Sequence, residues 1–165
     1  MATITNQAAL SYNGVTTLSN IAVGELVEVL TATKTAADTT YTAGGVKTFV
    51  ISLVNSSAAA LTGLTVTDTL GSYTFSGNTL YPLTYVSGSL LYYVNGALQA
   101  TPTVTATAPL TVTGVTVPAG GSAMLIYTAR VNEYAPLGVE DSITNTAAIT
   151  GGGLTSSVTA TETIN

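Results

Sequence analysis

Hydrophobic and polar residues alternate along most of the chain in short runs, and turn-forming residues separate these runs. Such alternation predicts β-strands with one buried face, because successive side chains of a strand point to opposite sides of the sheet. No segment keeps the 3.6-residue apolar spacing of an amphipathic helix. The pattern predicts strands at 27–35, 46–54, 63–70, 83–86, 89–94, 97–105, 110–117, 122–132, 142–150 and 155–164.

The turns between these strands have recognisable chemistry. Asn95-Gly96 is typical of a type I′ hairpin turn, and the three glycines at 151–153 supply the positive φ angles of a last hairpin. Many short strands at regular spacing indicate an all-β fold. We therefore predict an immunoglobulin-like Greek-key β-sandwich over residues 27–165.

An internal repeat places an extra element before this sandwich. The segments at 4–16 (ITNQAALSYNGVT) and 143–155 (ITNTAAITGGGLT) align without a gap and share Ile, Thr, Asn, two Ala, Gly and Thr. Both are typical of strand, tight turn and strand. Residues 1–26 are thus predicted to form an N-terminal β-hairpin that repeats the last hairpin of the sandwich.

This hairpin is the candidate assembly element. Alternation places Ile4, Asn6, Ala8 and Leu10 on one face, with Asn6 at the position of Asn145 in the second copy. The hairpin either pairs with the sheet of a neighbouring copy, as in donor-strand complementation, or folds back on its own sandwich. The first alternative is favoured, because the position in the sandwich that the hairpin would take is already filled by the last hairpin of the same chain. Such a head-to-tail contact does not close and builds a homopolymer.

Composition excludes several classes of function. Only 7% of residues are charged, the net charge is -5, and the chain has neither His nor Cys. Nucleic-acid binding needs clustered Lys and Arg, and a basic membrane-surface helix needs them too. Imidazole and thiolate chemistry are absent, so we expect no enzyme of those classes, no metal site and no cofactor. No apolar run reaches transmembrane length, so no membrane insertion is expected.

Three polar residues interrupt otherwise apolar strand faces. They are Lys34, beside Leu30 and Ala32, Asp68 among leucines and valine, and Asn145. Because a lone buried charge is costly, these residues either meet one another or reach water at a strand end. Lys47 has a similar parity but stands at the start of a strand, where we expect it to be solvated.

A meeting of the three would permit covalent chemistry. Desolvation favours a neutral Lys amine, which can attack the side-chain carbonyl of Asn145 while Asp68 transfers protons. Ammonia leaves and an amide cross-link remains. Asn6 is a second acceptor of the same parity. The alternative is an ordinary hydrogen-bonded polar trio, or a lysine that extends from a strand end to solvent.

Four tyrosines, at Tyr81, Tyr85, Tyr92 and Tyr93, are close together in the sequence. They form either a carbohydrate-stacking platform or an ordinary packing cluster on half-buried strands. Acidic residues are scattered and form no calcium-loop pattern.

The opening LTATKTAADTTYTAGGVKTFVISLVNSS, the following LTGLTVTDTL and the closing SITNTAAITGG carry a resemblance over about 25–165. They resemble the bacterial surface-protein repeat family called domain of unknown function eleven. The resemblance implies an immunoglobulin-like domain on a cell surface, without a defined catalytic activity. The chain looks more similar to the stand-alone subunits of Gram-positive surface or spore appendages than to one link of a giant adhesin. Gram-positive pilins and adhesins resemble it in using Lys, Asn and an acidic residue on paired strands.

The expected function is therefore structural: a subunit of an extracellular filament, pilus or appendage that polymerises by β-strand addition through residues 1–26. The alternative is a monomeric cell-surface adhesin or carbohydrate-binding module, with the host surface or a carbohydrate as partner. The first twelve residues do not have the pattern of a secretory signal peptide, so the export route stays open.

Overall fold

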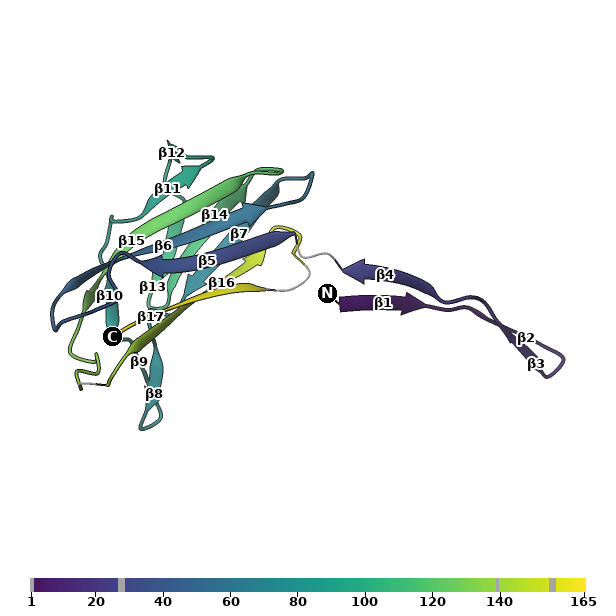
Figure 1. Cartoon of the computed structure of the whole chain (residues 1–165), viewed down its shortest axis with the longest axis horizontal. Coiled ribbons are helices and arrows are strands. Elements are labelled where there is room, and N and C mark those ends of the chain that lie inside the picture. The colour runs from purple at the N-terminus through teal and green to yellow at the C-terminus, as the bar shows by residue number, and fades with distance from the viewer. Residues whose placement is uncertain (1, 27–28, 139, 155–156) are drawn as a thin grey trace.

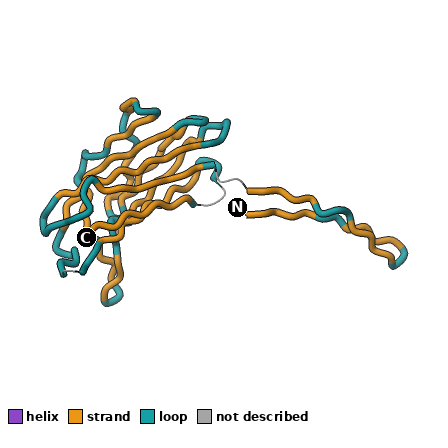
Figure 2. Tube along the Cα trace, in the orientation of Figure 1, coloured by secondary structure: helices purple, strands orange, loops and turns teal. Residues whose placement is uncertain are grey.

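The fold consists of two antiparallel sheets packed face to face, from which a long hairpin projects (Figure 1). The computed structural model describes residues 2–26, 29–138, 140–154 and 157–165. Figure 2 shows strands and loops throughout these residues, and they contain no helix long and apolar enough to span a membrane. The predicted all-β, immunoglobulin-like sandwich is confirmed.

The first sheet has one buried face, as the alternation of hydrophobic and polar residues predicts. Its strands, in spatial order, are β12 (Ala97–Gln99), β11 (Leu91–Val94), β15 (Ser122–Val131), β6 (Val46–Asn55) and β5 (Leu30–Ala36), and β10 (Leu83–Tyr85) also pairs with β15. Buried residues alternate with more exposed ones along β6 and β15. One face of this sheet therefore lies in the core and the other in solvent.

The second sheet completes the core. Its strands, in order, are β13 (Thr103–Thr107), β14 (Leu110–Val117), β7 (Leu61–Asp68), β16 (Ile143–Gly151) and β17 (Val158–Ile164). Neighbours such as β7 and β14 are distant in sequence, so the chain crosses between the sheets as a Greek key requires. Leu, Ile and Val side chains from both inner faces fill the space between the sheets.

The structure differs from the sequence prediction at several strand boundaries. The run predicted as one strand at 97–105 is broken at residues 100–102, so that β12 belongs to one sheet and β13 to the other. Pro102 lies in this break, where it cannot donate a ladder hydrogen bond. The prediction missed a small hairpin of β8 (Tyr73–Phe75) and β9 (Asn78–Leu80). Residues 27–28 and 155–156, at the starts of two predicted strands, lie outside the described residues.

The N-terminal hairpin is built from four strands: β1 (Ala2–Asn6) pairs with β4 (Ala22–Leu26), and β2 (Ala9–Tyr12) pairs with β3 (Val15–Leu18). Asn13 and Gly14 form its tip with φ angles of 48° and 78°, as a type I′ turn requires. In Figure 1 it extends away from the sandwich. Its described strands pair with one another and with no sandwich strand.

The hairpin has an irregularity that the sequence prediction missed. Asn6 pairs with Ala22 and Ala9 pairs with Leu18, which leaves two residues on one side and three on the other. The Ser19 hydroxyl accepts a hydrogen bond from the Ala8 N–H at 2.9 Å and stabilises this bulge. Residues 4–10 therefore do not form one continuous strand, and their alternation is interrupted.

Gly71 follows β7 at a crowded position of the core, and its replacement should be costly. Its φ is +72°, and a Cβ atom there would lie 2.3 Å from Cγ2 of Ile143. We expect Gly71→Ala to lower the free energy of unfolding by about 2–4 kcal/mol, through backbone strain and overpacking together. Urea denaturation would measure this loss.

Gly77→Ala is the matched control, because Gly77 has a φ of +78° and a Cβ atom added there would have nothing within 4 Å. It should lose only the strain contribution, about 1 kcal/mol. Equal losses in the two variants would show that packing against Ile143 contributes nothing.

Candidate functional site

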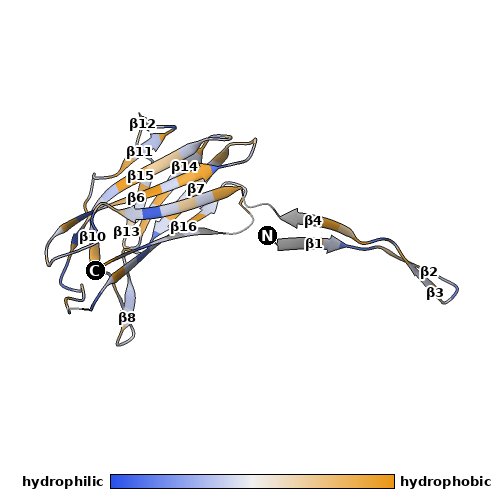
Figure 3. Ribbon diagram, viewed as in Figure 1, coloured by the Kyte–Doolittle hydropathy of each residue, from blue (hydrophilic) through white to orange (hydrophobic). Residues whose placement is uncertain are grey.

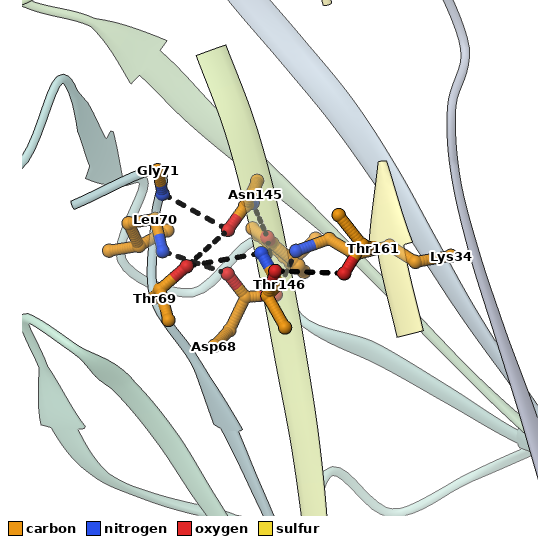
Figure 4. A network of polar contacts seen from close by, with 9 residues as sticks. Lys34, Asp68, Thr69, Leu70, Gly71, Asn145, Thr146 and Thr161 are labelled. Atoms are coloured by element: carbon orange, nitrogen blue, oxygen red, sulfur yellow. Dashed lines mark hydrogen bonds and ion pairs between the residues drawn. The ribbon is translucent and has the colours of Figure 1, made fainter. Parts of the chain in front are cut away.

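The three polar residues predicted from alternation meet between the two sheets. Lys34 extends from β5 in the first sheet, and Asp68 and Asn145 extend from β7 and β16 in the second (Figure 4). The Lys34 Nζ lies 2.6 Å from Oδ2 of Asp68, and the two side chains are 0% and 1% exposed. Asn145 is fully buried beside them. Neither charged residue reaches solvent, so the alternative of a lysine extended into water does not apply.

Tyr127 on β15 is the fourth member of this network, and the sequence analysis missed it. Its hydroxyl donates to Oδ2 of Asp68 at 2.8 Å and accepts from Nδ2 of Asn145 at 3.0 Å. Its ring stacks on Phe49, with centroids 5.5 Å apart. A signal was present: Tyr127 alternates with Leu125 and Ala129 on the buried face of its strand, and a buried tyrosine hydroxyl needs a partner.

The turn after β7 completes the hydrogen bonding of the network. Leu70 and Gly71 both have left-handed φ angles, 52° and 72°, and their N–H groups therefore point back toward the polar residues. The Leu70 N–H donates to Oδ1 of Asp68 at 3.0 Å, and the Gly71 N–H donates to Oδ1 of Asn145 at 3.1 Å. The Thr69 hydroxyl also approaches Oδ1 of Asn145, at 3.3 Å. Among the described residues no buried side-chain nitrogen or oxygen lacks a partner.

Burial changes the acid–base behaviour of two groups in the network. Desolvation lowers the pKa of Lys34 from 10.5 to about 8, although the Asp68 carboxylate opposes this shift. Desolvation, reinforced by Asp68, raises the pKa of Tyr127 well above 10. A neutral amine is thus accessible near physiological pH, while the tyrosine keeps its proton.

The arrangement joins a nucleophile to an amide through an unbroken set of hydrogen bonds. The bonds run from Lys34 to Asp68, from Asp68 to Tyr127 and from Tyr127 to the nitrogen of Asn145. These are the groups that an amide exchange requires: an amine of lowered pKa, an acid beside it and an acceptor amide.

The residues predicted to form the assembly face lie elsewhere. Ile4, Asn6, Ala8 and Leu10 are all exposed in the N-terminal hairpin, and none contacts the buried network. Ile4 and Leu10 expose 60% and 72% of their surface. Asn6 and Asn145 therefore share a sequence pattern but have opposite environments.

The four tyrosines do not gather on one exposed face. Tyr85 and Tyr92 are buried, whereas Tyr81 and Tyr93 are partly buried. The Tyr85 ring lies 6.3 Å from that of Tyr127, and the Tyr92 hydroxyl donates to the carbonyl of Thr116 in the opposite sheet. This arrangement favours the packing alternative.

Lys47 differs from its predicted solvated state. Only 7% of its side chain is exposed, and its Nζ lies 3.3 Å from Oδ2 of Asp38, which is 71% exposed. The lysine stem thus covers apolar surface while its amine pairs at the rim. In the part of the chain that the structure describes, no three His, Cys, Asp or Glu residues gather as metal ligands.

Comparisons with solved structures find a similar fold in bacterial pilus and adhesin proteins. The pilus backbone RrgB from Streptococcus pneumoniae is similar with a TM-score of 0.57 and 14% identity, over 73% of this chain and 31% of that chain. The major pilin subunit BcpA of Bacillus cereus gives 0.57 and 16%, over 98% and 47%. The N-terminal domain of the Streptococcus gordonii adhesin Sgo0707 gives 0.57 and 13%, over 91% and 35%.

These likenesses are likenesses of fold, and the chain spans less than half the length of each of these structures. No model of a protein family matches the chain, and no curated protein matches it. The resemblance to the surface repeat family therefore stays a prediction.

The lowered pKa of Lys34 predicts a pH-dependent stability when the amine is free. Asn145→Ala removes the amide that the Lys34 amine could attack, so the Lys34 amine remains free in this variant. Between pH 8 and 10.5 the unfolded chain binds more protons at Lys34 than the folded chain does, so the free energy of unfolding should rise with pH. The rise should total about 3 kcal/mol across this window.

Denaturation of Asn145→Ala at a series of pH values would measure the rise. The control is Asn145→Ala combined with Lys34→Met, which keeps every other titrating group. If both proteins showed the same slope, Lys34 would not be the group responsible.

Proposed function

We propose that the protein is a structural subunit of an extracellular filament, and that it polymerises through the N-terminal hairpin, residues 1–26. The observation that carries this proposal is the hairpin itself: an element with large apolar side chains that its own sandwich does not cover. These exposed side chains are Ile4, Leu10, Tyr12, Val15, Leu18, Ile21 and Val23. Exposed apolar surface of this kind marks interaction sites.

The charge pattern of the hairpin fits burial in a partner. Residues 2–24 contain no charged side chain. Covering them would desolvate no ion, and it would remove apolar surface from water. Figure 3 shows hydrophobic stretches both on this hairpin and on the sandwich strands.

The partner is proposed to be the sandwich of another copy, joined by β-strand addition. The N-terminal hairpin resembles the last hairpin of the sandwich in sequence, but that position is already filled within the same chain, because β16 pairs with both β7 and β17. On the opposite side of the sandwich, β12 and β13 end their sheets without a further partner among the described strands. A hollow of about 390 Å³ lies there, lined by residues that include Tyr85, Leu90 and Val104. These edges are candidates to receive the hairpin.

The direction of assembly is proposed to be head to tail. The two ends of the molecule carry different exposed apolar surfaces. The β8–β9 hairpin lies at the end of the sandwich away from the N-terminal hairpin (Figure 1), and it exposes Tyr73 and Phe75. Different surfaces of one chain that meet in successive copies generate an open fibre. The similarity in fold to pilus subunits supports this role and an extracellular location. The proposed location is a cell or spore surface.

We also propose an intramolecular amide between Lys34 and Asn145. The neutral Lys34 amine attacks Cγ of Asn145, a C–N bond forms, and the bond from Cγ to Nδ2 breaks with release of ammonia. Asp68 takes a proton from the amine. Asn145 is the favoured acceptor over Asn6 of another copy, because the Lys34 side chain is 0% exposed and paired within its own sandwich.

Deletion of residues 1–26 tests the assembly proposal. The truncated chain keeps every sandwich strand, so we expect a folded protein that forms no filaments, because no hairpin is left to add to a neighbour. Electron micrographs would detect filaments, and circular dichroism would verify the fold. Filaments of the truncated protein would exclude assembly through the hairpin. Dispersed single particles of the full chain would favour the alternative of a monomeric adhesin or carbohydrate-binding module.

A point substitution gives a finer comparison. Leu10→Lys places a charge on the hairpin, and Leu98→Lys places one on β12, where Leu98 is 60% exposed. If the hairpin inserts by its apolar side chains, Leu10→Lys should block filaments, since burial of an unpaired ammonium is costly. A block by Leu98→Lys as well would indicate that the β12 edge is the receiving surface.

The proposed amide is tested by intact mass under denaturing conditions. The wild-type chain should be lighter than its sequence mass by one ammonia. Asp68→Ala should have the full mass, because no acid remains to accept and return the proton. A detergent-resistant ladder of oligomers that disappears in Asn6→Ala would instead identify Asn6 as the acceptor.

A further inference from the structure

We propose that Tyr127 is the proton-transferring catalytic residue of the Lys34–Asn145 reaction. We propose also that the turn at residues 69–71 stabilises the negative charge that develops on Oδ1 of Asn145. This inference rests on the proposed amide and specifies how this chain would make it. The two polar atoms of the Asn145 amide have different partners: Nδ2 contacts Tyr127, and Oδ1 contacts the turn at residues 69–71.

Tyr127 touches the atom that must leave. Its hydroxyl lies 3.0 Å from Nδ2 of Asn145 and 2.8 Å from Oδ2 of Asp68. The same Oδ2 lies 2.6 Å from the Lys34 amine. A proton released by the amine thus has a path of three hydrogen bonds to the departing nitrogen, and every link of that path is a protein side chain.

The protons balance along this path. Lys34 passes one proton from its ammonium group to Asp68, and the resulting neutral amine attacks Cγ of Asn145. The attack leaves a second, now acidic, proton on the Lys34 nitrogen, which completes the amide when it is lost. Tyr127 gives its proton to Nδ2 and regains one from Asp68, while Asp68 takes the second proton from Lys34. Ammonia leaves, and no oxidant or further reactant is needed.

The environment suits Tyr127 to this task. Its pKa is raised by burial and by Asp68, so the phenol remains protonated and can donate. Its ring is fixed by the stack on Phe49, which limits movement of the hydroxyl. A group that donates and accepts through one oxygen is well placed to exchange protons in a concerted way.

The carbonyl of Asn145 faces a separate pair of donors. Negative charge develops on Oδ1 when the amine attacks, and the Gly71 N–H and the Thr69 hydroxyl lie 3.1 and 3.3 Å from this atom. Asp68 does not serve this role in the present arrangement, because its oxygens are occupied by Lys34, Tyr127 and the Leu70 N–H. Preorganised donors at a developing oxyanion lower a barrier substantially.

Tyr127→Phe tests the proton transfer, because it keeps the ring and removes only the hydroxyl. The full chain is synthesised in a cell-free reaction and quenched at intervals, and the fraction of chains lighter by one ammonia is measured. The rate should fall by about 100-fold or more. Tyr85→Phe is the matched control: Tyr85 lies in the same core, 6.3 Å from Tyr127, and makes no hydrogen bond to the network. It should react at the wild-type rate.

Thr69→Val and Thr69→Ser test the oxyanion site. Thr69→Val removes a donor to Oδ1 and should slow the reaction by up to about 100-fold, whereas Thr69→Ser keeps the hydroxyl and should restore most of the rate. Thermal unfolding of each variant verifies that the protein measured is folded. If Tyr127→Phe does not fold, the Thr69 pair still tests the oxyanion site, and the inference for that site stands or fails on it.

The outcomes separate the two proposals. A wild-type chain that loses ammonia together with a folded Tyr127→Phe that loses it equally fast would overturn the role of Tyr127 and leave the amide intact. Equal rates in Thr69→Val and wild type would overturn the oxyanion site. A wild-type chain of full mass would overturn the amide and this inference together.

Discussion

The ion pair between Lys34 and Asp68 is the interaction on which the rest of the core depends. Two charges in an apolar interior are tolerated only when their hydrogen bonds are complete, because desolvation otherwise outweighs their attraction. Lys34 and Tyr127 come from the first sheet, and Asp68 and Asn145 come from the second. The network therefore fixes how the two sheets pack, and a shift of one strand by a single residue would leave a buried charge without a partner.

The N-terminal hairpin and the sandwich show that similar sequence segments can lie in opposite environments. Segments 4–16 and 143–155 share much of their sequence, yet Asn145 is fully buried and Asn6 is exposed. The difference comes from the neighbouring strands. β16 has β7 and β17 beside it and packs against the other sheet, whereas the structure describes β4 alone beside β1. Alternation specifies which residues share a face, but only tertiary packing decides whether that face is covered.

This limit explains which predictions succeeded. Strand parity put Lys34, Asp68 and Asn145 on apolar strand faces, but it left open whether they meet one another or reach water at a strand end. The structure decides between these alternatives, because all three side chains are buried together. Tyr127 was missed because tyrosine is ordinary at a buried strand position, and its hydroxyl partners come from a different sheet. The β8–β9 hairpin was missed because its two strands are almost entirely exposed, so no buried apolar face marks them in the sequence. Lys47 was misjudged because its long stem allows burial together with an ion pair at the rim.

The positions of the hairpin and of the buried network relate the two proposals to one another. The N-terminal hairpin precedes β5, and β5 is an end strand of its sheet, where β6 is its one ladder partner among the described strands. If successive subunits are joined through the hairpin, tension along the filament pulls on β5 first. Hydrogen bonds along an end strand can be broken one after another, whereas a covalent bond at Lys34 would stop this process in the middle of the strand. An amide to Asn145 would transfer the load to β16, an inner strand of the opposite sheet. Lys34, whose burial makes the core costly to assemble, is thus also placed where a filament would most need reinforcement.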